Sequence, residues 1–132
     1  MSKDFIQEVK QDIYYKREDI TVPASGNTEL GVVTVGNDET IYCSINVTGQ
    51  ALDGFIISVR AHQDDSFQTL FSTSSHYTTP AGPMKATSSD LTSLSAGSNG
   101  FFLMDCRGFW QVKIEASAAS NSATVSIYVH GS

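Results

Sequence analysis

The sequence has few basic side chains and no long apolar run. Only 8 of its 132 residues are Lys or Arg, against 14 Asp or Glu, which gives a formal net charge of −6. Proteins that bind a phosphate backbone concentrate basic residues on one face, so we expect no nucleic-acid partner. No apolar stretch approaches the roughly 20 residues that cross a bilayer, and residues 1–11 lack the apolar core of a secretory signal. The sequence therefore predicts a protein made and folded in a cytoplasm, without a membrane partner.

Cysteine is equally scarce. The chain contains only Cys43 and Cys106, too few for a disulfide scaffold and too far apart for a metal-binding knuckle. Cys43 is in phase with Ile41 and Ile45, so its side chain is expected to point inward. In a reducing compartment two buried thiols behave as small hydrophobic side chains, and we interpret both cysteines in this way. Whether a bridge joins them is left open by the sequence.

The motifs of common enzymes are also missing. The chain has no G-x-S-x-G nucleophile elbow, no P-loop, no dinucleotide-binding glycine pattern and no H-E-x-x-H zinc motif. No nucleophile stands with a base in a recognisable constellation. We therefore expect a protein that is not an enzyme and that carries no cofactor.

Two groups of side chains have the chemistry of metal ligands. The histidines are far apart in sequence, which favours solvated surface residues over a three-histidine site: His62, His76 and His130. The carboxylates cluster near turns, where they could gather a calcium ion, but Asp is frequent in turns because it bonds its own backbone: Asp38-Glu39, Asp53 and Asp64-Asp65. We expect no bound metal. Asp105 and Arg107, which flank Cys106, are expected to form a local ion pair.

What the chain does have is an alternation of apolar and polar residues near its C-terminus. One apolar row holds Trp110, Val112, Ile114 and Ala116, and a second holds Ala123, Val125, Ile127 and Val129. Successive side chains of a strand point to opposite faces, so each row predicts a strand with one buried face. The short polar segment 118–122 predicts a tight connection between the two strands. Trp110 is accordingly expected in the core.

Similar signals fill the rest of the body. Further short strands are expected, each bounded by Gly, Asn, Asp or Pro, at 20–22, 29–35, 40–48, 54–62, 67–73 and 101–106. The Ser-, Thr-, Gly- and Pro-rich run 74–99 is longer than a connection in a compact domain, so it should contain one or two weak strands or lie across a partner. The sequence predicts an all-β domain over residues 20–132, an antiparallel β-sandwich or jelly roll of seven to eight strands.

The N-terminal segment, residues 1–19, differs from this body. It carries nine of the 22 charged side chains. Its apolar residues recur at the spacing of an amphipathic helix: Phe5, Ile6, Val9 and Ile13. A helix this short must dock on something. Either it packs on its own domain, or it is an arm that reaches a neighbouring subunit, with Tyr14 and Tyr15 as adhesive side chains.

Tyrosines supply a second candidate surface. Tyr42 and Tyr128 fall on the outward rows of their strands, and Tyr77 lies in the long run 74–99. Exposed aromatic rings stack on sugar rings, but they are equally common in protein interfaces.

Taken together, these segments resemble a known class of protein. The charged arm, the opening ITVPASGNTELGVVTV (20–35), the Ser/Thr/Gly-rich body and the ending GFWQVKIEASAASNSATVSIYVHGS (108–132) resemble the small β-sandwich virion proteins of tailed bacteriophages, in particular capsid decoration (cement) proteins. The resemblance implies a protein that folds in the host cytoplasm, becomes part of the virion and has no catalytic residues. It further implies a homo-oligomer, a trimer above all, that binds the major capsid protein and stabilises the shell.

Two functional hypotheses follow. In the first, subunit or capsid contact is made by the arm, through Phe5, Ile6, Val9, Ile13, Tyr14 and Tyr15. In the second, the chain is a carbohydrate- or receptor-binding module of a phage tail or fibre, with Tyr42, Tyr77 and Tyr128 as the stacking surface.

Overall fold

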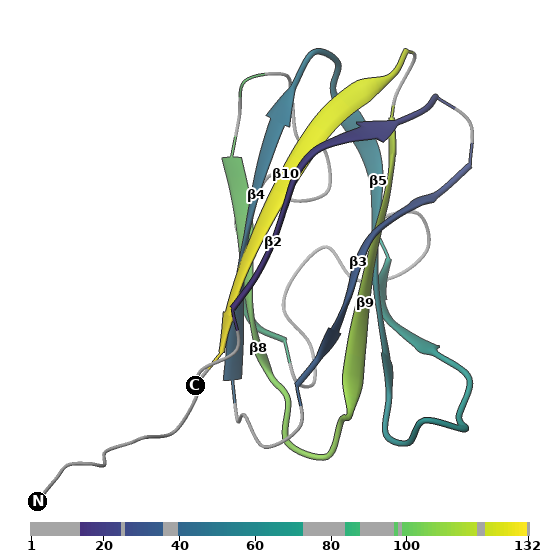
Figure 1. Ribbon diagram of the computed structural model, residues 1–132, viewed down its shortest axis with the longest axis vertical. Helices are drawn as coiled ribbons and strands as arrows, with labels where there is room; N and C mark the ends of the chain where they lie inside the picture. The colour runs from purple at the N-terminus through teal and green to yellow at the C-terminus, as the bar shows by residue number, and fades with distance from the viewer. Residues whose placement is uncertain are drawn as a thin grey trace, which may run out of the picture.

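Two antiparallel sheets face each other across a shared core, as the computed structural model of the chain shows (Figure 1). The structure describes residues 14–24, 26–35, 40–72, 84–87, 97, 99–118 and 121–131. One sheet has the strand order β2-β10-β4-β8-β7 and the other β3-β9-β5-β6. Their bounds are β2 Tyr14–Val22, β3 Thr28–Thr34, β4 Thr40–Thr48, β5 Leu52–Arg60, β6 Gln68–Ser72, β7 Met84–Thr87, β8 Asn99–Asp105, β9 Gln111–Ala118 and β10 Ala123–Gly131.

The all-β sandwich predicted from the sequence is confirmed; its jelly-roll variant stays a prediction. The described residues form nine strands instead of seven or eight. The additional strand is β7, which lies inside the Ser/Thr-rich run where a weak strand was expected. The strand expected at 20–22 begins earlier, at Tyr14, which places residues 14–19 in β2, paired along β10. The boundary expected between residues 19 and 20 thus falls within β2.

The core consists of the inward rows of both sheets. The side chains of Val112, Ile114 and Ala116 on β9 are fully buried, as are those of the predicted row on β10. Between the layers, the Phe55 and Phe102 rings meet edge to face, with centroids 6.3 Å apart. The alternation therefore identified the buried faces of these strands correctly.

Both cysteines are buried and neither is part of a disulfide, as expected for thiols that behave as small hydrophobic side chains. Burial raises the pKa of the Cys43 thiol far above its ordinary value, because a thiolate would be unsolvated there. Cys43 is thus a packing residue and not a nucleophile.

The expectation that Trp110 lies in the core is wrong. Trp110 precedes β9 and is only half-buried. Its backbone joins the two neighbouring strands, since its N–H donates to the carbonyl of Arg60 at 2.8 Å and its carbonyl accepts from Val35 N–H at 2.8 Å. The alternation does not extend back to Trp110 because the chain is still leaving the turn at Gly108, a residue with φ of 91°. Ala61 follows the end of β5 and is exposed.

Side chains of β2 join the two sheets at one edge of the sandwich. The Tyr15 hydroxyl donates to the carbonyl of Leu30 at 3.4 Å, and Arg17 Nη1 donates to the carbonyl of Glu29 at 3.1 Å. Both acceptors lie where the register of β3 against β9 shifts. The Tyr15 ring covers Gly31 so closely that a Cβ there would lie 2.6 Å from Cε2 of the ring. Tyr15 therefore makes its contacts inside the domain.

Candidate functional site

Three aromatic side chains lie on the outer face of the five-stranded sheet. On β4, Ser44 is paired with Phe101 of β8 on one side and with Tyr128 of β10 on the other. Tyr42 lies two residues from Ser44 and so points to the same face. The Tyr42 and Phe101 rings are stacked, with centroids 5.7 Å apart and planes 14° from parallel. We call Tyr42, Phe101 and Tyr128 the aromatic face.

Tyr42 is the most prominent member of the aromatic face. It is 42% exposed, more than any other large hydrophobic side chain in the described ranges. It is flanked across the sheet by His130 and Leu103. An exposed ring among apolar and aromatic neighbours offers a flat surface to a sugar ring or to another protein.

A hydrogen bond fixes Tyr128. Its hydroxyl donates to Glu18 Oε2 at 2.8 Å, across the pairing of β10 with β2. The bond to the Glu18 carboxylate is the largest cause of a raised pKa at Tyr128, because a phenolate would lose that bond and face a negative charge. Tyr128 thus stays a neutral donor at physiological pH.

The structure brings together two of the three predicted sugar-stacking residues. Tyr42 and Tyr128 point outward, as predicted, and lie on the same face as diagonal neighbours across the β4–β10 pair. Tyr77 lies outside the described residues. The sequence reasoning missed Phe101, although its alternation with Phe102 in 101–106 is the same signal that identified the other strands.

The predicted arm residues are placed only in part. Phe5, Ile6, Val9 and Ile13, with the helix expected for them, lie outside the described residues. Tyr14 is the first residue of β2, where its backbone pairs with His130. His130 in turn pairs with Tyr42. The described part of the chain therefore begins in the row of the sheet that holds Tyr42.

A second cluster of polar and aromatic side chains lies on the other sheet. Arg60 of β5 donates from Nε and Nη2 to Oε1 of Gln111 on β9, at 2.9 and 2.5 Å. Gln111 Nε2 donates onward to Thr34 Oγ1 on β3 at 3.0 Å. The Arg60 guanidinium lies 4.6 Å from the centroid of the Phe67 ring and 5.2 Å from that of Trp110. These contacts tie three strands together.

Arg60 also holds the loop between β5 and β6. Its Nη1 donates to the carbonyls of Gln63 and Asp65, at 2.9 and 3.3 Å. The Asp65 N–H donates to the carbonyl of His62 at 3.0 Å. Hydrogen bonds of both the N–H and the carbonyl of Asp65 therefore fix the conformation of the loop.

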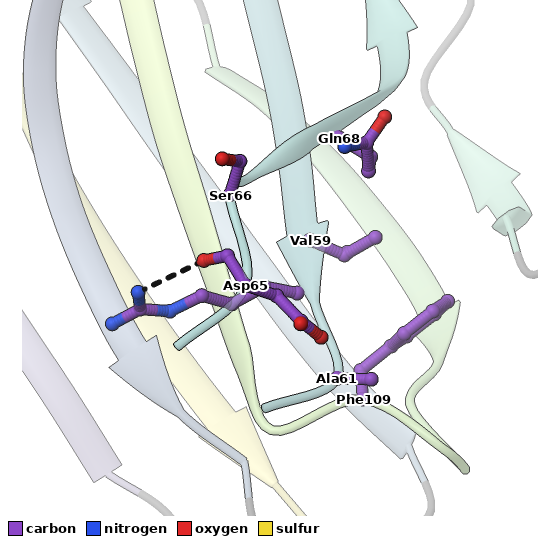
Figure 2. A pocket seen from close by; sticks show the side chains of 7 residues that line it. Val59, Ala61, Asp65, Ser66, Gln68 and Phe109 are labelled. Carbon is purple, nitrogen blue, oxygen red and sulfur yellow. Dashed lines mark hydrogen bonds between the residues drawn. The ribbon is translucent and has the colours of Figure 1, made fainter. Parts of the chain in front are cut away.

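An open hollow of about 440 Å³ lies between this loop and the β8–β9 turn (Figure 2). The Phe109 ring extends from the turn beside Val59 and Ala61, and Asp65 lies opposite it on the loop. The described residues that line the hollow are Val59, Arg60, Ala61, Asp65, Ser66, Gln68 and Phe109. A smaller hollow of about 260 Å³ is lined by Ala61, His62, Gln63 and Trp110.

The acidic side chains are dispersed in the described part of the chain. No group of three or more His, Cys, Asp or Glu there is placed to hold a metal ion. Asp53 accepts a hydrogen bond from Ser117 at 2.9 Å, and Asp64 lies 3.7 Å from His62. The predicted ion pair of Asp105 with Arg107 is confirmed, at 2.7 Å. His76, Asp38 and Glu39 lie outside the described residues. Across the described ranges, no helix is long and apolar enough to span a membrane.

Comparison with known proteins finds likeness in structure alone. No protein-family model matches the chain, and no curated protein sequence matches it. Among solved structures it is similar to the SPBc2 prophage-derived protein YomS, with a TM-score of 0.51, 12% identity, and coverage of 92% of this chain and 96% of that one. Chains of Bacillus endospore appendages, described as a family of disulfide-linked pili, align over 93% of this chain and 91% of theirs, at 13% identity and a TM-score of 0.43.

Proposed function

We propose that this chain is a non-enzymatic structural protein of a bacteriophage particle, which binds the outside of the capsid and stabilises the shell. The observation that carries the proposal is the fold shared with YomS from end to end, over 92% of this chain and 96% of the prophage-derived protein. The likeness itself concerns the fold; the prophage origin of the neighbour agrees with the resemblance of residues 20–35 and 108–132 to virion β-sandwich proteins.

The aromatic face supplies a surface for the partner, which we take to be the major capsid protein. Exposed aromatic rings are enriched at protein interfaces because they bury much area at a small cost in side-chain entropy. The segment 1–13 directly precedes Tyr14, with which the described part of the chain begins in the row of the sheet that holds Tyr42. Its apolar residues Phe5, Ile6, Val9 and Ile13 would therefore extend the same contact.

The overall affinity for the capsid rises when several copies of the protein bind together. A protein that binds as a homo-oligomer, a trimer in our proposal, places several weak contacts on one lattice, and each contact after the first forms at a high effective concentration. A small interface per subunit is then sufficient.

The proposal is tested by co-sedimentation of the purified protein with phage particles that lack it. The full chain should pellet with the particles, and Tyr42→Phe should do the same because the aromatic ring is kept. Tyr42→Ala and a chain without residues 1–13 should each lose at least about tenfold in affinity for the particles. This loss is expected because each aromatic anchor contributes more than about 1.4 kcal/mol to binding. Unchanged binding by both Tyr42→Ala and the truncated chain would contradict the assigned surface, and no binding by the full chain would contradict the function.

The second candidate is a carbohydrate- or receptor-binding module of a tail or fibre. It is favoured by one observation, the position of Tyr42 and Tyr128 on a single face. Retention of the protein on immobilised glycans, lost in Tyr42→Ala, would support this candidate. A protein that is inert toward glycans but sediments with particles would rule it out.

A further inference from the structure

We infer that the hollow beside Phe109 is a binding site for one pyranose ring of a neutral saccharide. The site lies at the end of the sandwich between the β5–β6 loop and the β8–β9 turn (Figure 2). It is distinct from the aromatic face, which lies on the outer surface of the other sheet. The inference does not depend on the proposed function.

The lining has the two chemical halves that a sugar ring requires. Val59, Ala61 and Phe109 form an apolar side, on which the C–H groups of a pyranose can pack. Asp65, Ser66 and Gln68 supply polar groups around it. Together they offer a carboxylate acceptor, a hydroxyl, and an amide that both donates and accepts, which suits neighbouring hydroxyl groups of a sugar.

The polar groups of the hollow are available for a ligand. Both Asp65 and Gln68 are exposed. The backbone N–H and carbonyl of Asp65 are already used in the loop, whereas its carboxylate accepts no hydrogen bond from another residue of the described ranges. These backbone bonds fix the position of Asp65 in the loop, while its exposed carboxylate keeps acceptor capacity that no described residue uses.

Arg60 argues against an anionic ligand. It is the only cation of the described lining, and its guanidinium is already engaged by Gln111 and by the carbonyls of Gln63 and Asp65. Four of its five N–H donors make these bonds, so a phosphate or carboxylate would find only one N–H of Arg60 without breaking them.

A cationic ligand fits no better. The positive charge of Arg60 lies in the same lining as the negative charge of Asp65. The two largely offset each other at short range, so a cation gains little over its hydration in water. A neutral ligand with many hydroxyl groups is the class that remains.

The size and the rigidity of the hollow suit this ligand. Its volume of about 440 Å³ falls within the roughly 300–1,000 Å³ of small-molecule sites. Arg60 and the Phe67 and Trp110 rings hold the loop in one conformation before a ligand binds. Binding therefore costs little conformational entropy of the loop. We expect a dissociation constant on the order of 1 mM for a single sugar ring.

The experiment is a titration of the isotope-labelled full chain, followed by amide chemical shifts in NMR. The probes are the methyl pyranosides of glucose, galactose, mannose and N-acetylglucosamine, each to about 50 mM, well above the expected dissociation constant. At least one should saturate and shift the amides of 61–68 and 108–109. Asp65→Ala and Gln68→Ala alter exposed side chains that the fold does not need, and each should weaken binding about tenfold. Phe109→Leu keeps the apolar volume but loses the flat ring, and should also weaken binding. Asp64→Ala is the matched control, because it removes an exposed carboxylate of the same loop that does not line the hollow, and it should bind as the unaltered chain does.

Three results would overturn the inference. The first is the absence of saturable shifts with every probe. The second is binding that survives both Asp65→Ala and Gln68→Ala. The third is a set of shifts centred on Tyr42 and Tyr128, which would assign sugar binding to the aromatic face instead.

Discussion

Gly31→Ala tests the contact that joins the two sheets at the β2–β3 edge. The new Cβ would lie 2.6, 2.7 and 2.8 Å from Cε2, the hydroxyl oxygen and Cζ of Tyr15, distances at which the ring has to move. Overpacking of this kind costs about 1–3 kcal/mol. Alanine is less flexible than glycine in the unfolded chain, so the substitution also stabilises the folded state by about 0.5 kcal/mol. We expect a net destabilisation of about 1.5 kcal/mol, which corresponds to a fall of about 5 °C in Tm for a chain of this size.

The assay is urea unfolding of four proteins: the unaltered chain, Gly31→Ala, Tyr15→Ala and the double variant. If the cost of Gly31→Ala comes from the Tyr15 ring, it should disappear once the ring is removed, and the added methyl group should then be neutral or slightly stabilising. An equal loss of unfolding free energy from Gly31→Ala in both backgrounds would refute the reasoning and would point to the backbone of β3 as the cause.

Three further outcomes are expected. Arg60→Lys should lower the unfolding free energy by about 1–2 kcal/mol in urea, because an ammonium cannot reach the amide acceptor and both loop carbonyls together; unchanged stability would contradict the role given to the guanidinium. The pKa of Tyr128 is raised in the folded state by its bond to Glu18, so the stability from this bond is fully present below the ordinary tyrosine pKa of 10.0 and is lost as the pH rises through the folded-state value. Tyr128→Phe should therefore flatten the pH dependence of Tm above this point, and an unchanged slope would contradict the bond. Cys43 and Cys106 should resist a thiol reagent in the native protein and react only on unfolding, since both are buried; rapid native reaction would contradict their burial.

The sequence carried enough information to predict the sandwich because four of its strands, β4, β8, β9 and β10, alternate buried and more exposed residues along their length. On β9 and β10 every second residue is apolar, and those are the residues that the structure buries. The face to which each side chain points follows from its position in its own strand, so the buried face can be predicted without knowing the partner strand. The same local reasoning placed Tyr42 and Tyr128 on outward positions.

The candidate sites depend on the pairing of strands, which the local pattern does not contain. Tyr42, Phe101 and Tyr128 come from β4, β8 and β10, and only the register brings them around Ser44. The loop hollow likewise needs Phe109 to lie against the β5–β6 loop. Trp110 shows the limit of the pattern itself, because an alternation in sequence does not reveal where the turn ends and the strand begins.

The most direct test of the central claim is the composition of purified particles produced from the genome that encodes this chain. The account predicts that the protein is present in a fixed molar ratio to the major capsid protein on a stained gel, and that the ratio survives repeated purification. Absence of the protein from the particles, or an amount that varies between preparations, would contradict its assignment as a structural protein of the virion.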